Sequence, residues 1–168
     1  MLLKIRQVFT VFALSILLLL TSCATQAPSR FDQAQQESSQ RGSSAVVKES
    51  ESGGSFNQFF PPSGGGYERV YTQEKKGFAE AKLKKDGKEV AMLAISDTLN
   101  NPTAAKKFEK STQNIGGYPA VSQGSTGTAV LVGDRYQVKV LSRDPAFSES
   151  DRQAWLEKFD LNGLSQLK

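Results

Sequence analysis

The sequence predicts an α+β domain: a mainly antiparallel sheet of about six strands with two main helices packed on one of its faces. Short segments in which apolar and polar residues alternate indicate the strands. Asp-Gly and Gly-Asp pairs between neighbouring segments indicate tight hairpin turns, which join antiparallel strands. Apolar residues at helical spacing in two other segments indicate the helices, which need the apolar face of a sheet to cover them.

Six segments have the length and composition of strands and are bounded by turn residues. They cover residues 67–72, 78–84, 90–95, 118–122, 128–132 and 135–142. The segment 90–95 is continuously apolar, so we expect it at the centre of the sheet, covered on both faces. The pairs Asp86-Gly87 and Gly133-Asp134 supply the positive φ angles that tight hairpins require.

Two segments carry helix signals. Asn101 followed by Pro102 starts the first helix, which we expect to run to about Thr112. Ser148 is the expected N-cap of the second helix, and Asp151, three residues later, completes a capping box. Aligning the first half of the domain with the second is consistent with a duplicated ββ(β)α unit. The alternative is that any two hairpin-plus-helix units look alike at this level.

The N-terminus carries the features of an export signal. A basic start precedes an apolar run over residues 8–20, and Thr21 and Ser22 lie before Cys23, the only cysteine of the chain. This arrangement resembles the signal sequence and lipobox of bacterial lipoproteins. The resemblance implies a signal peptide over residues 1–22 and lipidation of the Cys23 sulfur with long acyl chains such as palmitate.

The competing interpretations of this segment are a transmembrane anchor and an ordinary secretory signal. The apolar run is shorter than the about 18 residues that a spanning helix needs, and a secretory signal would leave an unpaired thiol. Acyl chains hold a protein at a membrane, because each buried methylene contributes about 0.8 kcal/mol. With Ala24 after the cysteine, the resemblance implies the periplasmic leaflet of the outer membrane in a Gram-negative cell, and otherwise the outer face of the plasma membrane.

Residues 23–66 are rich in Ser, Gln and Gly. Such a segment buries too little apolar area to offset its ordering entropy, so we expect a flexible, lipidated linker followed by a globular domain over residues 67–168. Phe56, Phe59 and Phe60 interrupt this composition. They either cap an edge of the folded domain or form a docking peptide for a partner.

The first hairpin is rich in lysine, with acidic residues between the lysines. These are Lys75, Lys76, Lys82, Lys84, Lys85 and Lys88. They are a candidate contact for anionic headgroups or an acidic partner, and the alternative is a solvated face that also protects an exposed strand. The whole chain has a net charge of +4, and removal of the signal with Lys4 and Arg6 would leave an excess of about two positive charges. This is too small for a dedicated nucleic-acid-binding protein, so we expect no nucleic-acid partner.

The sequence contains no histidine, and its only cysteine is expected to carry lipid. These facts exclude a Ser-His-Asp or Cys-His nucleophile and a His/Cys zinc site. Asp86, Asp97, Asp134 and Asp144 are expected at turns or strand ends, where Asp commonly accepts hydrogen bonds from nearby backbone N–H groups. We therefore expect no catalytic residue, no metal, no cofactor and no enzymatic activity.

Residues 118–168 resemble small, uncharacterised envelope domains in which a meandering sheet is followed by a C-terminal helix ending in an Asp-Leu pair, here Asp160-Leu161. This resemblance implies a fold and no active site. The expected function is a lipid-anchored, non-catalytic binding or accessory module of the cell envelope, with the membrane and an envelope protein as partners. The alternatives are a carboxylate-dependent envelope hydrolase and a structural spacer without a specific ligand.

Overall fold

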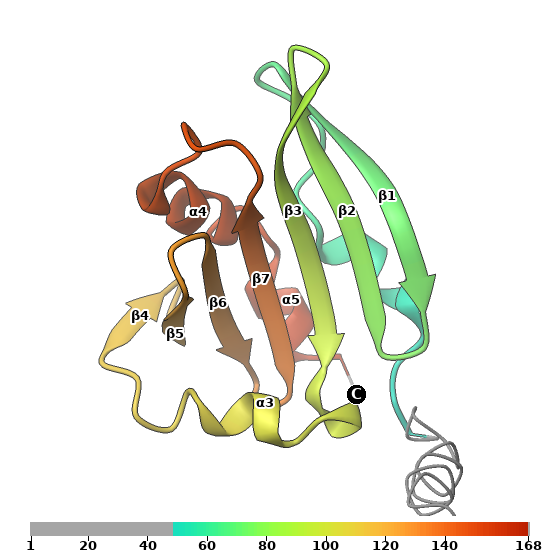
Figure 1. Ribbon diagram of the computed structural model, residues 1–168. Helices are drawn as coiled ribbons and strands as arrows, with labels where there is room; N and C mark the ends of the chain where they lie inside the picture. The colour runs from blue at the N-terminus through green and yellow to red at the C-terminus, as the bar shows by residue number, and fades with distance from the viewer. Residues whose placement is uncertain (1–48, 168) are drawn as a thin grey trace, which may run out of the picture. The chain divides into compact units, whose positions relative to one another are not determined.

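The computed structural model describes residues 49–167, which form a seven-stranded antiparallel sheet with short helices (Figure 1). The strands are β1 (Tyr67–Lys75), β2 (Phe78–Lys85), β3 (Lys88–Asp97), β4 (Gln113–Ile115), β5 (Tyr118–Gln123), β6 (Gly127–Val132) and β7 (Tyr136–Ser142). The helical segments are η1 (Gly53–Phe59), η2 (Thr98–Asn100), α3 (Thr103–Lys106), α4 (Glu149–Leu156) and α5 (Leu161–Ser165). The α+β class is therefore confirmed, but the sheet has seven strands rather than six.

The strands lie in the order β1-β2-β3-β7-β6-β5-β4. Two meanders, β1 to β3 and β4 to β7, meet where β3 pairs with β7, in a register that runs from Ala91 opposite Ser142 to Asp97 opposite Tyr136. The continuously apolar segment 90–95 belongs to β3 and thus lies inside the sheet, as predicted. The two halves share this meander pattern, but the second half has an extra edge strand and the helices that follow differ, so the duplication stays a prediction.

The signals at the two hairpin turns and at the α4 cap are confirmed, whereas α3 has Pro102 as its N-cap and no side-chain cap, so Asn101 does not cap it as expected. Asp86 and Gly87 have φ angles of 50° and 76°, and Gly133 and Asp134 have φ angles of 56° and 55°, all in the left-handed region that tight hairpins need. At α4, the Ser148 side chain accepts a hydrogen bond from the backbone of Asp151, and the Asp151 side chain accepts one from the backbone of Ser148. This is the predicted capping box.

The first helix is shorter than predicted and lies on the opposite face of the sheet. α3 ends at Lys106, and the chain continues through turns to Phe108, which packs against Ala129 and Leu131 of β6. Val130, by contrast, belongs to the main core, and successive residues of a strand point to opposite faces. The prediction of two helices on one face is therefore wrong for α3. Small alanines dominate the apolar stripe of this segment and support only one helical turn.

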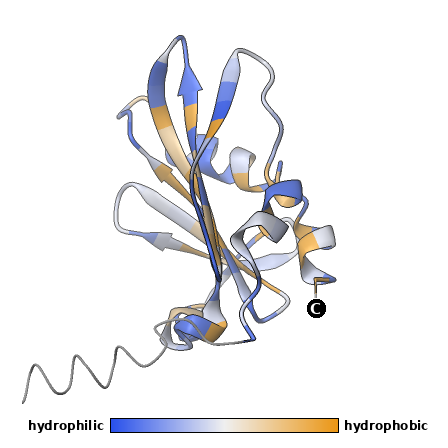
Figure 2. Ribbon diagram, turned by 90° about the vertical axis from the view of Figure 1, so that its right-hand side faces the viewer, coloured by the Kyte–Doolittle hydropathy of each residue, from blue (hydrophilic) through white to orange (hydrophobic). Residues whose placement is uncertain are grey.

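The main core fills the space between the other face of the sheet and η1, α4 and α5, which lie on one side of it (Figure 2). β3 and β7 contribute alternate side chains to this core, including Leu93, Ile95 and Val138, each 0% exposed. The single tryptophan, Trp155 of α4, is 5% exposed and packs into the same core. Its fluorescence will therefore report unfolding directly.

Residues 49–66 belong to the folded domain, so the predicted domain start at Tyr67 and the predicted linker are wrong over this stretch. Phe56, Phe59 and Phe60 are 0%, 6% and 4% exposed. The Phe56 ring lies 5.8 Å from that of Tyr136, in an edge-to-face arrangement. The surrounding composition is hydrophilic, but large aromatic rings dominate the burial energetics of a short segment and bring it into the core.

Within residues 49–167, no helix has the length and apolarity needed to cross a bilayer. Residues 1–48 and 168 lie outside the described part of the chain. The predicted signal peptide over residues 1–22, the lipidation site Cys23 and the first part of the predicted linker all fall in that range, so these interpretations stay predictions.

Candidate functional site

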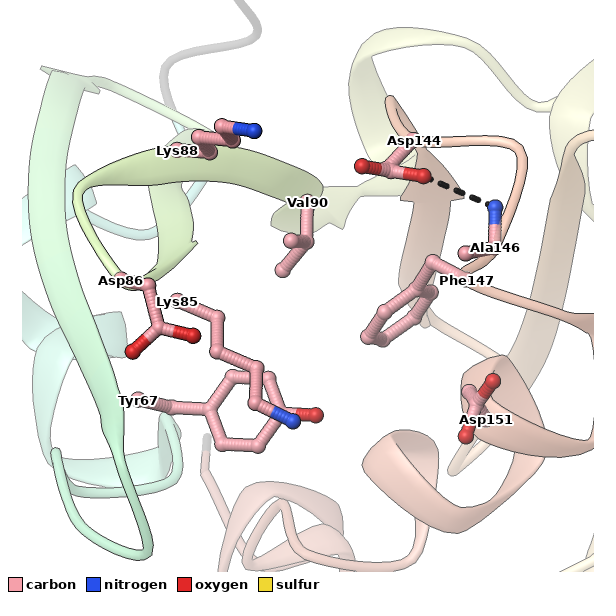
Figure 3. A pocket seen from close by; sticks show the side chains of 9 residues that line it. All are labelled: Tyr67, Lys85, Asp86, Lys88, Val90, Asp144, Ala146, Phe147 and Asp151. Carbon is pink, nitrogen blue, oxygen red and sulfur yellow. Dashed lines mark hydrogen bonds between the residues drawn. The ribbon is translucent and has the colours of Figure 1, made fainter.

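A cleft of about 420 Å³ opens between the β2–β3 hairpin and the segment that connects β7 to α4 (Figure 3). We call it the hairpin cleft. It is lined by Tyr67, Lys85, Asp86, Lys88, Val90, Asp144, Ala146, Phe147 and Asp151. These residues come from the two meanders and from α4, so the cleft exists only in the folded chain. It combines cationic, anionic and aromatic side chains.

The hairpin side of the cleft carries cations over an aromatic ring. The tight turn at Asp86 and Gly87 places Lys85 and Lys88 on either side of the hairpin tip. The Lys85 Nζ lies 5.1 Å from the centroid of the Tyr67 ring, and that ring contacts Trp155 at 5.0 Å between centroids. At an exposed position such a cation–π contact contributes about 0.5–1 kcal/mol. Lys85 is thus positioned over a surface anchored in the main core.

The opposite side of the cleft is held by local hydrogen bonds. Asp144 Oδ1 accepts a hydrogen bond from the Ala146 backbone at 2.8 Å, which closes the turn after β7. The Ser142 hydroxyl donates to the Phe147 carbonyl at 2.6 Å and holds this segment against the end of β7. Hydrogen bonds from the Ser148 hydroxyl and backbone lower the pKa of Asp151 below its ordinary value. The carboxylates Asp144 and Asp151 therefore already accept bonds from neighbouring donors.

The pKa of Asp151 bears on the alternative of a carboxylate hydrolase. Such an enzyme needs a carboxyl group whose pKa is raised, so that it can donate a proton. The pKa of Asp151 is shifted in the opposite direction. Among residues 49–167, no group of Asp, Glu, His or Cys side chains is arranged to hold a metal ion. The lining also holds two cations, Lys85 and Lys88, and two aromatic rings, those of Tyr67 and Phe147.

The six predicted lysines do not form one surface. Lys85 and Lys88 line the hairpin cleft, whereas Lys75 and Lys76 lie at the other end of β2 and line a separate pocket of about 370 Å³. Lys82 and Lys84 alternate with the core residues of β2 and so project from the opposite face of the sheet. Lys82 also pairs with Glu89 at 2.8 Å.

The predicted docking residues Phe56, Phe59 and Phe60 are also not available to a partner. Their rings are buried between η1, the sheet and the C-terminal helices; for example, the Phe60 and Phe159 rings lie 5.2 Å apart. The alternative given by the sequence, that these rings cover part of the folded domain, matches their position. The docking prediction is therefore wrong for the folded chain.

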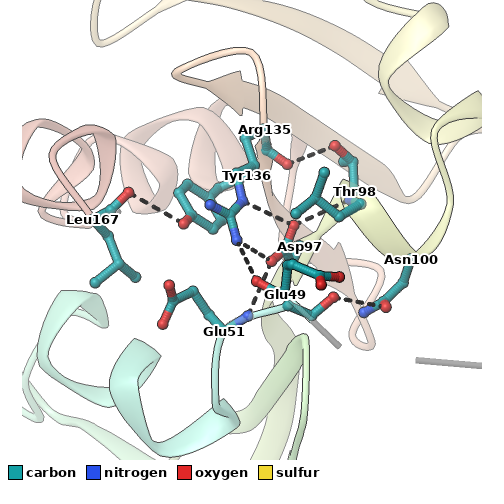
Figure 4. Close-up of polar contacts among 10 residues, drawn as sticks. Glu49, Glu51, Asp97, Thr98, Asn100, Arg135, Tyr136 and Leu167 are labelled. Carbon is teal, nitrogen blue, oxygen red and sulfur yellow. Dashed lines mark hydrogen bonds and ion pairs between the residues drawn. The ribbon is translucent and has the colours of Figure 1, made fainter. Parts of the chain in front are cut away.

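At the far end of β3 lies a buried ion pair, which the sequence does not reveal (Figure 4). Asp97 is 2% exposed, and Arg135 donates to it from Nη2 at 2.8 Å and from Nε at 3.2 Å. The backbone N–H groups of Leu99 and Glu51 also donate to the Asp97 carboxylate, each at 3.1 Å. Arg135 Nη2 reaches the Glu49 carbonyl as well, at 3.2 Å. The pair therefore fastens residues 49–51 to the sheet.

Tyr136, next to this pair, holds the C-terminal end of the chain. Its hydroxyl donates to the Leu167 carbonyl at 3.2 Å (Figure 4). Burial raises the pKa of Tyr136 to about 12 against the opposing influence of Arg135, so the hydroxyl stays protonated at neutral pH and keeps this bond. Both ends of the described chain are thus fixed beside the β6–β7 hairpin.

The Asp97–Arg135 pair predicts that acid destabilises the domain. Burial alone raises the pKa of Asp97, but the bonds from Arg135, Leu99 and Glu51 outweigh it, so the pKa in the folded state lies below the ordinary value of 3.8. A carboxylate with a lowered pKa stabilises the fold above the pKa of the unfolded chain, and this stabilisation is lost as the pH falls through the folded pKa.

We expect the urea midpoint, followed by Trp155 fluorescence, to change little between about pH 7 and 5 and to fall below about pH 4. In the Asp97→Asn variant the midpoint at pH 7 is already lower, and the further fall in acid is smaller. Equal acid sensitivity in the two proteins would show that Asp97 does not carry the effect.

Comparisons were made with protein-family models, curated proteins and solved structures. None of them matches this chain. The functional conclusion must therefore come from the residues themselves. Sequence reasoning singled out Lys85, Lys88 and Asp144 of the hairpin cleft but not its aromatic members Tyr67 and Phe147. Tyr67 begins β1 opposite Lys85 and Phe147 lies in the connection between β7 and α4, so neither ring carries a sequence signal of a binding site.

Proposed function

We propose that this chain is a lipid-anchored, non-catalytic binding module of the cell envelope and that it recognises a protein partner through the hairpin cleft. The observation that carries the proposal is a cleft of about 420 Å³ in which Lys85 lies over the Tyr67 ring, with Lys88 and the Phe147 ring also in the lining. Recognition sites combine apolar and aromatic lining with a few polar groups that fix orientation. The hairpin cleft has this composition.

The charges of the cleft favour a particular kind of partner segment. Asp144 and Asp151 accept hydrogen bonds from the loop and helix cap beside them, whereas Lys88 is exposed at the tip of the hairpin. At the hairpin, Lys85, Lys88 and the Asp86 carboxylate are all exposed, so two of these three accessible charges are cationic. An acidic side chain next to an apolar one would satisfy both the lysines and the rings, so we expect a partner that presents such a pair.

The lipid anchor supplies the second part of the proposal. Acyl chains on Cys23 would confine the domain to the membrane surface, where the effective concentration of an envelope partner is high and weak contacts suffice. The Cys23→Ala variant is expected to move from the membrane fraction to the soluble fraction. Fractionation with high-salt and carbonate washes, followed by immunoblotting, measures this shift. Unchanged membrane retention of the variant would contradict the anchor.

Site-specific photo-crosslinking in the cells of origin tests the cleft. A benzophenone amino acid at Lys88 is expected to give a discrete adduct with one envelope protein. The same amino acid at Lys110, which is exposed and lies outside the cleft, is the matched control and is expected to give none. Lys85→Glu, combined with the probe at Lys88, should reduce the yield of the adduct.

The same experiment separates the binding module from a structural spacer. No adduct at Lys88, or identical adducts at both probe positions, would contradict recognition through the cleft and would favour the spacer. An adduct at Lys88 that persists unchanged in the Lys85→Glu background would show that charge is not part of the recognition.

A further inference from the structure

A second pocket contains a buried cation without a counter-ion. Arg152 of α4 is 3% exposed. Its Nε donates to the Thr128 hydroxyl and its Nη1 to the Ser142 hydroxyl, both at 2.9 Å. Both acceptors are neutral. The ion pairs formed within residues 49–167 do not include Arg152.

Neutral hydroxyl acceptors do not balance the buried charge of Arg152. Burying a charge is costly unless an opposite charge pairs with it, and a guanidinium does not lose its proton in a protein. Arg152 has five N–H groups, and the two hydroxyls are its acceptors within residues 49–167, so it has N–H groups left for a ligand. A site of this kind is suited to an anion that arrives from outside, and a carboxylate fits the planar guanidinium in a bidentate manner.

Arg152 lines a pocket that an external anion can enter. The pocket has a volume of about 330 Å³ and lies between the β5–β6 turn, the connection after β7 and the start of α4. We call it the arginine pocket. Its polar and charged lining includes Thr126, Arg143, Asp144, Ser148, Glu149 and Arg152. Its volume is at the lower end of the about 300–1,000 Å³ typical of ligand pockets, so it suits a small ligand.

The charges of the lining limit the chemistry of that ligand. Two arginines and two carboxylates face the same space. The Arg143 side chain is 48% exposed, and its Nε lies 3.5 Å from Glu89 Oε1. Glu149 accepts a hydrogen bond from Ser122 at 2.8 Å and makes no ion pair with Arg152. A phosphate dianion would meet repulsion from Asp144 and Glu149. A molecule with one negative and one positive group would satisfy both signs.

We propose that the arginine pocket binds a small molecule that carries both a carboxylate and an ammonium group, such as a free amino acid, with the carboxylate on the Arg152 guanidinium and the ammonium group toward Glu149. This site goes beyond the proposed function, because it needs neither the lipid anchor nor a protein partner. It shares Asp144 and Phe147 with the hairpin cleft. Arg152, through the Ser142 hydroxyl, also holds the Phe147 carbonyl, so the ligand binds against the wall that separates the two sites.

The test uses the full chain, labelled with ¹⁵N and purified in detergent micelles. L-alanine, acetate, ethylammonium and phosphate are titrated separately at constant ionic strength. L-alanine is expected to shift the Arg152 Nε–H signal and the amide signals of Thr126 and Glu149 in a saturable way. Acetate is expected to bind more weakly, and ethylammonium and phosphate to cause no saturable shift. No saturable shift with L-alanine, or an equal or larger response to phosphate, would overturn the proposal.

Matched variants assign the response to the pocket. Arg152→Met is expected to weaken L-alanine binding at least about tenfold, because it removes the charged partner of the carboxylate. Lys106→Gln, an exposed charge change on α3, is expected to leave it unchanged. Glu149 is exposed, so Glu149→Gln should leave the core intact and can test the pocket even if Arg152→Met fails to fold. It should lower L-alanine affinity to that of acetate while acetate affinity is retained. Wild-type affinity for L-alanine in Glu149→Gln or in folded Arg152→Met would contradict the proposal.

Discussion

Phe56→Ala is expected to lower the free energy of unfolding by about 4 kcal/mol, which is a large part of the stability of a small domain. Phe56 is 0% exposed, and its ring packs edge-to-face on Tyr136 at the centre of the main core. Alanine would leave a cavity under η1. The cavity would not close, because the buried rings of Phe59 and Phe60 still hold this segment on the sheet. Urea denaturation followed by Trp155 fluorescence measures the loss.

Gln58→Ala is the matched control for this prediction. Gln58 lies in the same helical segment but is exposed, so its substitution should change the free energy of unfolding by no more than about 0.5 kcal/mol. A loss below about 1 kcal/mol for Phe56→Ala would show that η1 is not an integral part of the core. Deleting residues 49–66 should then also be tolerated, whereas we expect that deletion to prevent folding.

Asp97→Ala is expected to lower the free energy of unfolding by about 3 kcal/mol, because the buried carboxylate is the acceptor for two backbone N–H groups and for Arg135, which is 24% exposed. Four hydrogen bonds to the carboxylate are lost at once: two from Arg135 and one each from the Leu99 and Glu51 backbones. The last of these fastens residues 49–51. Thermal and urea unfolding measure the loss of stability. Hydrogen exchange should also show that the amides of residues 49–51 exchange faster in the variant than in the original chain.

A double-mutant cycle with Arg135→Met isolates the pair. The loss in the double variant should be smaller than the sum of the losses in the single variants, by about 1–3 kcal/mol, because each single substitution already breaks the interaction. Additive losses would mean that Asp97 acts only through the backbone donors of Leu99 and Glu51. In that case Asp97→Asn would keep an acceptor for only one of these two donors, because Leu99 donates to Oδ1 and Glu51 to Oδ2.

Much of the fold could be predicted from the sequence because its signals are local. Alternation over 78–84, the apolar run 90–95 and the turn at Asp86-Gly87 depend only on neighbouring residues, and each is found where expected. The edge strand β4 has only Ile115 buried and offers no alternation to detect. The burial of η1 cannot be predicted from local sequence. Its aromatic rings lie within a hydrophilic stretch and are buried by contacts with residues far along the chain.

The candidate sites depend on such distant contacts. The hairpin cleft needs β3 beside β7, since only that pairing brings Lys85 and Lys88 near Asp144 and Phe147. The hairpin is rich in lysine, but its lysines are not gathered on one surface. Lys82 and Lys84 alternate with the core residues of β2, and the other four lysines lie at opposite ends of the hairpin. Arg152 carries no sequence signal at all, because an arginine in an amphipathic helix ordinarily faces water.

The placement of the Asp97–Arg135 pair has a mechanical consequence. β3 runs from Lys88, at the hairpin cleft, to Asp97, where residues 49–51 join the sheet. An extended strand of this kind rises about 3.3 Å per residue, so the chain enters the domain roughly 30 Å from the cleft. Under the proposed attachment through Cys23, a pull transmitted along the polypeptide would act first on the Asp97–Arg135 pair, and the proposed recognition surface would lie at the opposite end of β3.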